Sequence, residues 1–247
     1  MFVLEIFFAS LQGVLATSAA ILVFIIFLIY RLRPKQYYFI RHGETILNKK
    51  HIKQGADGAL TPKGVAQALL LGKVFADLQI QELCVSPYER AVETATLMQQ
   101  SLKTKIIVTP LLAERKSPSE VLGKDTEDPE VTRITALTAY GYHENSYRYS
   151  DEENFEDLAA RAKKCLSFLS HRPYQRIVVV THHAFLQMLL SYLLYREDLT
   201  ASTYVKLSFF NPAENGGVTT CVYKPWKFLS KTKGWEIVAY NQRAEES

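Results

Sequence analysis

The sequence predicts an α/β protein: a three-layer α/β/α sandwich with a mostly parallel central sheet, preceded by one N-terminal transmembrane helix. Short apolar, strand-like runs alternate with segments of helical periodicity, which is typical of layered α/β domains. One of these runs, Ile177–Val180, is apolar throughout, as in a parallel strand buried on both faces. The helix is predicted because no charged residue lies between Ile6 and Tyr30.

The uncharged stretch predicts two domains. Residues 1–35 are expected to form an anchor, with a span of the lipid bilayer at about residues 10–30 and a basic juxtamembrane segment that carries Arg31, Arg33 and Lys35. A cleaved signal peptide would start with basic residues and end with small ones, and neither is present. Residues 36–247 are expected to form one globular domain. Because basic flanks stay in the cytosol, this domain is expected to face the cytoplasm from the membrane.

The composition excludes other classes of protein. Hydrophobic residues make up 48% of the 247 residues and charged residues 22%, which indicates a globular chain. A formal charge of +4 gives no basic stripe, so no nucleic-acid partner is expected. The three cysteines are odd in number and widely spaced, which argues against a disulfide framework or a zinc knuckle.

The expected elements of the first half follow from apolar runs and helix-start signals. A polar loop, Glu44–Leu60, follows the first strand, and Thr61 with Pro62 predicts the start of a helix. Ser86–Glu89 has the pattern of a capping box, which predicts a helix to about Ser101. The expected strands are Tyr37–Ile40, Leu83–Val85 and Ile106–Val108.

The second half contains a long aromatic segment and further alternation. Residues 116–150 are expected to form a lid or binding loop with short helices. A helix is predicted from Asn154 to about Leu169, then the strand Ile177–Val180, then an apolar helix to about Tyr195. The expected strands at the end are Tyr204–Phe210, Gly217–Tyr223 and Trp235–Tyr240.

Two histidines and two arginines are the candidate site. His42 and His182 each follow a predicted strand, and ligands of open α/β sheets bind at the carboxyl ends of strands. Arg41 precedes the first histidine, and Arg90 lies in the first turn of a predicted helix, where anions dock. If the sheet is parallel there, the four residues converge into a cradle for a phosphoryl group, with His42 as a candidate nucleophile.

Phosphoryl transfer in such a cradle requires no metal and no cofactor. The attacking histidine must be neutral, and a backbone carbonyl at its other ring nitrogen would fix the tautomer. The leaving oxygen needs a proton, and Glu114, at a strand end beside a loop, is the candidate donor.

The ordered motifs resemble the histidine phosphatase superfamily, with its phosphoglycerate-mutase-like fold. Arg41–Thr45 (RHGET) is similar to the leading signature of that family, Ser86–Ala91 (SPYERA) to its second arginine block and Leu112–Arg115 (LAER) to its acid block. Val179–His182 (VVTH) resembles the last block. The resemblance covers residues 37 to the C-terminus.

The resemblance implies a phosphomonoester hydrolase that works through a phosphohistidine. His42 would take the phosphoryl group, and Arg41, Arg90 and His182 would hold its oxygens. Glu114 would protonate the leaving oxygen and then assist water. By the same resemblance, three residues of the first loop line the substrate side: Asn48, Gln54 and Gly55.

Some positions depart from the family pattern. His183 stands where the family has glycine, and Glu120 is a rival to Glu114 as the acid. The aromatic residues of the first loop of cofactor-dependent mutases are missing at Leu47 and Gly55–Ala56, which favours a phosphatase over a phosphoglycerate-type mutase. A membrane-tethered module that binds a phosphorylated ligand without turnover is the alternative from another class. The expected substrate is a phosphorylated small molecule or a phosphoprotein.

Overall fold

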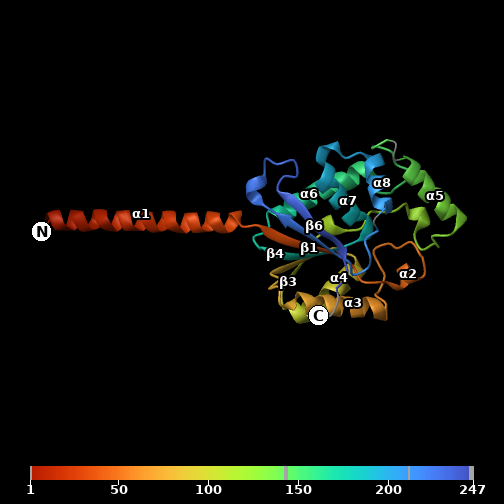
Figure 1. Ribbon diagram of the computed structural model, residues 1–247, viewed down its shortest axis with the longest axis horizontal. Helices are drawn as coiled ribbons and strands as arrows, with labels where there is room; N and C mark the ends of the chain where they lie inside the picture. The colour runs from red at the N-terminus through yellow and green to blue at the C-terminus, as the bar shows by residue number, and fades with distance from the viewer. Residues whose placement is uncertain (1, 142–143, 211, 245–247) are drawn as a thin grey trace.

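A computed structural model describes residues 2–141, 144–210 and 212–244, and only the backbone of residues 2–15, 140 and 209–210. Among these residues, six strands form a single sheet in the order β3-β2-β4-β1-β5-β6 (Figure 1). The strands are β1 (Lys35–Arg41), β2 (Glu82–Val85), β3 (Lys105–Val108), β4 (Arg176–Thr181), β5 (Val218–Tyr223) and β6 (Trp235–Gln242). All pairings among β1, β2, β3 and β4 are parallel. β5 pairs antiparallel with β1 and with β6, so the sheet is mixed.

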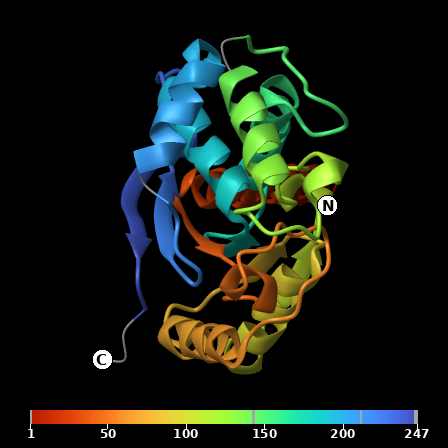
Figure 2. The same cartoon turned by 90° about the vertical axis from the view of Figure 1, so that its right-hand side faces the viewer.

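Helices cover both faces of this sheet. α3 (Pro62–Ala76) and α4 (Glu89–Leu102) pack on one face, and α6 (Phe155–Ser170), α7 (His183–Tyr195) and α8 (Ala201–Phe210) lie on the other (Figure 2). Two short helices lie in loops, α2 (Ile46–Lys49) and α5 (Pro129–Tyr140). Short 3₁₀ turns complete the fold at Pro110–Leu112, Ser119–Val121, Arg196–Asp198 and Pro225–Lys227.

Side-chain alternation along the central strands produces two cores. Successive residues of a strand point to opposite faces of the sheet. Ile177 and Val179 of β4 therefore join the core under α6 and α7, while Val178 and Val180 join the core under α3 and α4. The expected α/β sandwich is confirmed, and β4 is buried on both faces as its uniformly apolar sequence predicts.

The N-terminal helix α1 (Phe2–Leu32) extends away from the sheet (Figure 1). Its side chains from Ile21 to Tyr30 are exposed. Residues 10–15 of the expected span lie outside the part of the chain whose side chains are described. Within the described part, no helix is sufficiently long and apolar to cross a membrane.

Two local predictions were wrong. Residues 204–210 form most of α8 and not a strand, because Tyr204 packs against Phe155 and its hydroxyl donates to the carbonyl of Ala184. Ser86 does not cap α4, whose N-cap residue Tyr88 makes no side-chain capping bond. The hydroxyl of Ser86 instead lies 2.6 Å from the Nε2 atom of His182.

The segment from 116 to 153 is held against the first loop and α6. The isolated bridge between Ile52 and Asp125 pairs it with the first loop, and the amide of Lys53 donates to the carbonyl of Lys124. At its other end, Arg148 forms an ion pair with Asp157 in the first turn of α6. The expected short helices are present as α5 and the turn Ser119–Val121, and the role of the segment as a lid or binding loop stays a prediction.

Candidate active site

The pairing of β1 with β4 brings the two histidines together. Arg41 and Thr181 are register partners in adjacent parallel strands, so the residues that follow them, His42 and His182, leave the same edge of the sheet. Their ring centroids are 5.1 Å apart, and both side chains are buried. The predicted convergence of the two strand ends is therefore a feature of the structure.

His42 is held by contacts at its backbone and at both ring nitrogens. Its amide donates to the carbonyl of Thr181 at 3.0 Å. Its Nδ1 atom lies 2.8 Å from the carbonyl oxygen of Gly43, which requires a proton on Nδ1 and leaves the lone pair on Nε2. The Nε atom of Arg90 donates to this Nε2 atom at 3.1 Å.

The electrostatic surroundings keep His42 neutral. Burial lowers the pKa of His42 well below its ordinary value, and the positive charges of Arg90 and Arg41 lower it further. The pKa of His182 is also well below its ordinary value, through burial and then through His42 and Arg90. A neutral imidazole beside two guanidinium groups is a potential nucleophile with cationic groups in position for a phosphate.

Arg90 is fixed by the start of α4 and by the first loop. Its Nη1 atom donates to the carbonyl of Gly55 at 2.9 Å. The hydroxyl of Thr94, one turn later, donates to the carbonyl of Arg90 and accepts from the amide of Gly43. These bonds tie α4 to the turn after β1, so the guanidinium and the imidazole keep a fixed separation.

Three buried nitrogens of the site have no hydrogen-bond partner among the described residues: Arg41 Nε, His182 Nδ1 and His183 Nδ1. Arg41 also donates through Nη1 to the carbonyl of Ala213 at 2.7 Å. A buried donor without a partner costs about 1–3 kcal/mol. Arg41 Nε is a donor in every state of its side chain, so it indicates a place for an anion, whereas each neutral imidazole donates from Nδ1 in only one of its two tautomers.

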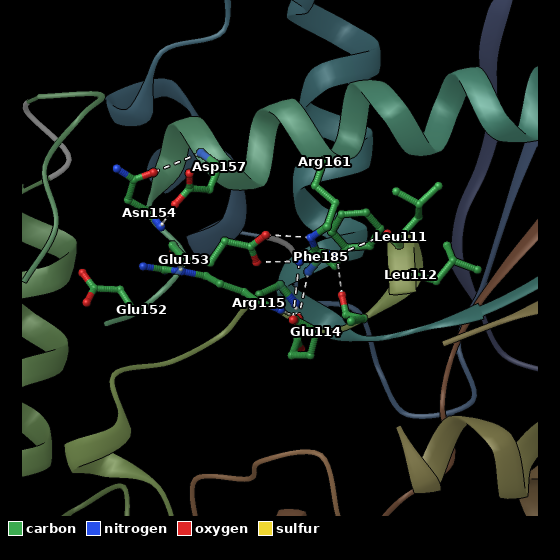
Figure 3. A network of polar contacts seen from close by, with 12 residues as sticks. Leu111, Leu112, Glu114, Arg115, Glu152, Glu153, Asn154, Asp157, Arg161 and Phe185 are labelled. Carbon is green, nitrogen blue, oxygen red and sulfur yellow. Dashed lines mark hydrogen bonds and ion pairs between the residues drawn. The ribbon is translucent and has the colours of Figure 1, made fainter. Parts of the chain in front are cut away.

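The carboxylate of Glu114 lies at the amino end of α7. It accepts from the amides of Ala184 at 3.2 Å, Phe185 at 3.0 Å and Arg115 at 2.8 Å (Figure 3). Its rival Glu120 is exposed and accepts from the hydroxyl of Ser150. Glu114 also borders, with Tyr88, a cavity of about 390 Å³. Burial lowers the pKa values of Arg41 and Arg90, and the charge of Glu114 raises them against this effect, so its carboxylate lies near both guanidinium groups. Its role as the acid, in place of Glu120, stays a prediction.

The turn that carries Glu114 is held by Arg161 of α6. The guanidinium donates to the carbonyl of Ala113 at 2.7 Å and that of Leu111 at 3.2 Å, and it forms a double contact with the carboxylate of Glu153 (Figure 3). No sequence motif marked Arg161, because the carbonyls that it binds lie about 50 positions away along the chain.

The three residues expected to line the substrate side shape the first loop. Gly55 provides the carbonyl that Arg90 binds. Asn48 forms a reciprocal cap of α2 with Thr45, and the Oε1 atom of Gln54 accepts from the hydroxyl of Thr45 at 3.0 Å. Their contact with a substrate stays a prediction.

Asn215 is a site residue that the sequence did not reveal. Its Nδ2 atom donates to the carbonyls of His42 at 3.0 Å and Gly43 at 3.2 Å, and to Oδ1 of Asn48 at 3.3 Å. It lies in the loop before β5, which pairs with β1. Only that strand pairing brings this amide to the turn after β1.

Among the described residues, no group of three or more His, Cys, Asp or Glu side chains is placed to hold a metal ion. A neutral histidine between arginines, at the carboxyl edge of an α/β sheet, is instead typical of proteins that bind and transfer a phosphoryl group. The chain belongs to branch 1 of the histidine phosphatase superfamily, whose family model matches residues 37–235.

Individual relatives include phosphatases and mutases. The chain is 28% identical over 149 residues to a protein of Hydrogenobacter thermophilus named as a candidate phosphoserine phosphatase, covering 60% of this chain and 73% of that one. It is 30% identical over 162 residues to a probable phosphoglycerate mutase of Erwinia tasmaniensis, covering 64% and 74%. The fold is similar to that of a mycobacterial glucosyl-3-phosphoglycerate phosphatase, with a TM-score of 0.68 at 21% identity, covering 85% and 98%.

Proposed function

We propose that the chain is a metal-independent phosphomonoester hydrolase that acts through a phosphohistidine on His42. The observation that supports this most directly is the state of His42: neutral, fixed through Nδ1 and with its Nε2 lone pair beside Arg90. A histidine with a protonated Nε2 could not attack phosphorus.

In the first step, the Nε2 lone pair of His42 forms a bond to phosphorus, and the bond from phosphorus to the leaving oxygen breaks. Glu114 gives its proton to that oxygen. Arg41, Arg90 and His182 hold the equatorial oxygens, where charge is concentrated in the transition state. The unpaired nitrogens of Arg41 and His182 support these roles.

In the second step, Glu114 takes a proton from water, the water oxygen bonds to phosphorus, and the phosphorus–nitrogen bond breaks. Inorganic phosphate leaves, and Nε2 regains its lone pair. The amides that hold Glu114 keep it at the edge of the cavity beside Tyr88, where a leaving group and then a water molecule would lie. Acid and base catalysis by one carboxyl group is consistent with this order of events.

The substrate we propose is a phosphorylated small molecule, since the relatives named above are a candidate phosphoserine phosphatase, a mutase and a sugar-phosphoglycerate phosphatase. A phosphoglycerate-type mutase is the second candidate, because two relatives are named as phosphoglycerate mutases. The two differ in the acceptor, which is water in a phosphatase and a second hydroxyl of the substrate in a mutase.

The experiment is phosphate release from an aryl phosphate and from a panel of phosphorylated metabolites. We expect His42→Ala to abolish release, whereas His171→Ala, at an exposed histidine outside the site, retains it. Equal release by both variants would contradict the proposal. Isomerisation of phosphoglycerate without release of phosphate would identify a mutase. Tight binding of a phosphorylated metabolite without turnover would identify a binding module.

For the location of the chain, we propose attachment to a membrane with the catalytic domain in the cytoplasm. Support comes from the uncharged stretch between Ile6 and Tyr30 and from the basic residues that follow it. Protease added to intact cells should leave the domain undigested while the chain sediments with membranes. Digestion, or recovery in the soluble fraction, would contradict this location.

A further inference from the structure

The connection between β5 and β6, residues 224–234, displays large apolar side chains on the surface. Trp226 is 48% exposed, Phe228 60% and Leu229 83%. Three lysines of the same connection are also exposed: Lys227, Lys231 and Lys233. We refer to these six residues as the hairpin tip. Aromatic and aliphatic side chains interleaved with lysines are typical of segments that lie at a lipid–water interface.

The backbone of the hairpin tip is internally hydrogen-bonded. The amide of Ser230 donates to the carbonyl of Lys227 at 2.9 Å, and the hydroxyl of Ser230 accepts from the amide of Gly234 at 3.1 Å. The amide of Lys224 closes the loop by donating to the carbonyl of Gly234 at 2.8 Å. The apolar side chains are therefore displayed by an ordered turn.

A basic cleft lies beside the base of the connection. Its lining includes Arg33, Arg176 and Lys224 and no carboxylate, and it has a volume of about 380 Å³. Lys224 also pairs at 2.6 Å with Glu236, which lies outside the cleft and also contacts Lys227 at 2.8 Å. The cleft thus offers positive charge and room for an anionic headgroup.

The hairpin tip and the basic cleft lie where α1 leaves the domain. The Pro225–Lys227 turn contacts α1, and Gln175, which lines the cleft, donates to the carbonyl of Tyr30 at 3.4 Å. Figure 1 shows α1 and the β5–β6 connection at the same end of the molecule. The exposed apolar side chains of α1 therefore continue toward the hairpin tip.

We propose that this end of the domain binds the surface of an anionic phospholipid bilayer. Phe228 and Leu229 would enter the boundary between headgroups and acyl chains, and the lysines and the basic cleft would contact lipid phosphates. A lipid surface explains the apolar and basic groups together, and the adjoining apolar helix has the same preference. This inference does not depend on the catalytic proposal.

Binding of this end to a bilayer would set the direction in which the candidate active site faces. β1 begins at Lys35, beside α1, and ends at Arg41, beside His42, so the site lies at the opposite edge of the sheet. The candidate active site would then face away from the bilayer, toward the aqueous phase. A water-soluble phosphorylated substrate can reach such a site without leaving solution.

Trp226 provides a direct test in the full chain. The chain has two tryptophans, and the other, Trp235, is 3% exposed and buried in the core. The full chain is reconstituted in phosphatidylcholine vesicles with or without phosphatidylglycerol, with bromine on the acyl chains as a fluorescence quencher. We expect quenching in the anionic vesicles that is lost in Trp226→Phe, which assigns the signal to residue 226.

Two further variants test the chemistry of the contact. Phe228→Ser with Leu229→Ser should lose the quenching of Trp226. Lys231→Glu with Lys233→Glu should weaken the quenching and reduce its dependence on phosphatidylglycerol, since the basic cleft stays intact. Phosphate release should not change in either variant. Leu122→Ser is a matched control at an exposed apolar residue outside the hairpin tip, and Trp226 should be quenched in it as in the parent.

Several outcomes would overturn the inference. Sedimentation with vesicles without quenching of Trp226 would show that α1 alone holds the chain. Equal quenching in neutral vesicles would exclude recognition of anionic lipid. A fluorescence change that appears without vesicles and rises with protein concentration would assign the hairpin tip to contact between copies of the chain.

Discussion

The Nε atom of Arg90 donates to the Nε2 atom of His42 at 3.1 Å, so the candidate nucleophile and the candidate phosphate ligand are hydrogen-bonded to each other. The bond is possible only with a lone pair on Nε2, and the carbonyl of Gly43 at Nδ1 enforces the same tautomer. The same lone pair would bond to phosphorus, so Arg90 must release Nε2 and turn its guanidinium to the phosphate oxygens when a substrate binds. In the free chain, the contact orients the candidate nucleophile and holds a positive charge beside the position that phosphorus would take.

Glu114→Gln should slow the first chemical step, and the loss should be larger for a substrate whose leaving oxygen must be protonated before it departs. We expect leaving-group release from an alkyl phosphate in a single turnover to fall by about 10²-fold, the usual contribution of a general acid. Release from 4-nitrophenyl phosphate should fall much less, since nitrophenolate leaves without protonation. The matched variant Glu120→Gln, at an exposed carboxyl, should change neither rate. Equal losses for both substrates in Glu114→Gln would contradict the assignment.

Asn215→Ala should lower kcat because it releases the turn that carries His42. The variant removes the donor to the carbonyls of His42 and Gly43, and a misplaced nucleophile loses much of the benefit of orientation. We expect kcat to fall by about tenfold, which corresponds to about 1.4 kcal/mol of lost orientation of the nucleophile. Steady-state kinetics together with thermal unfolding distinguish this from a general loss of folded protein. An unchanged kcat would show that Asn215 has no positioning role.

Arg172→Ala should destabilise the domain by about 3 kcal/mol or more, since it leaves a buried carboxylate without its partner. Glu82 is fully buried, and its two carboxylate oxygens accept from Arg172 at 2.6 and 2.7 Å. Urea unfolding measures the change. The control is Arg133→Ala, which breaks an exposed pair with Glu130 and should leave stability nearly unchanged. Similar small effects of both variants would contradict this account of Glu82.

Stability should fall as the pH drops below about 6.5, the ordinary pKa of histidine. His42 and His182 have pKa values well below this in the folded chain, so between the folded and unfolded pKa values the unfolded chain binds more protons. The free energy of unfolding then decreases with falling pH by up to about 1.4 kcal/mol per pH unit for each histidine. Urea unfolding at several pH values tests this. Replacing both histidines by Asn should make the decrease below pH about 6.5 shallower, with His183 as the remaining histidine of lowered pKa. A flat profile in the parent would contradict their neutral burial.

Most of the architecture followed from local patterns. The apolar residues of β4 predicted burial on both faces, and Thr61 with Pro62 marked the start of α3, where the hydroxyl of Thr61 accepts from the amide of Gly64. The aromatic and β-branched residues near Tyr204 suggested a strand. The segment is helical because its contacts with α6 and α7 outweigh the local preference for a strand. These contacts are between residues far apart in the chain, so a short stretch of sequence does not reveal them.

The residues that carry the chemistry of the candidate site could be predicted from the sequence, but the residues that hold them in place could not. Arg41, His42, Arg90 and His182 stand at strand and helix ends, so their convergence follows from a parallel arrangement. Long-range partners were invisible in the sequence: Ser86, which had the pattern of a helix cap, bonds His182. Asn215 and Arg161 act on backbone carbonyls far along the chain, and such contacts have no sequence signature.

The most direct test of a phosphohistidine on His42 is to trap it during turnover. The chain is mixed with a substrate that carries labelled phosphorus and is quenched in denaturant within one turnover, and the label is mapped by mass spectrometry of alkaline digests. We predict an acid-labile label on the peptide that contains His42, formed and lost at rates compatible with turnover, and absent in His42→Ala. Turnover without any labelled histidine, or a label on His182 in place of His42, would contradict this account.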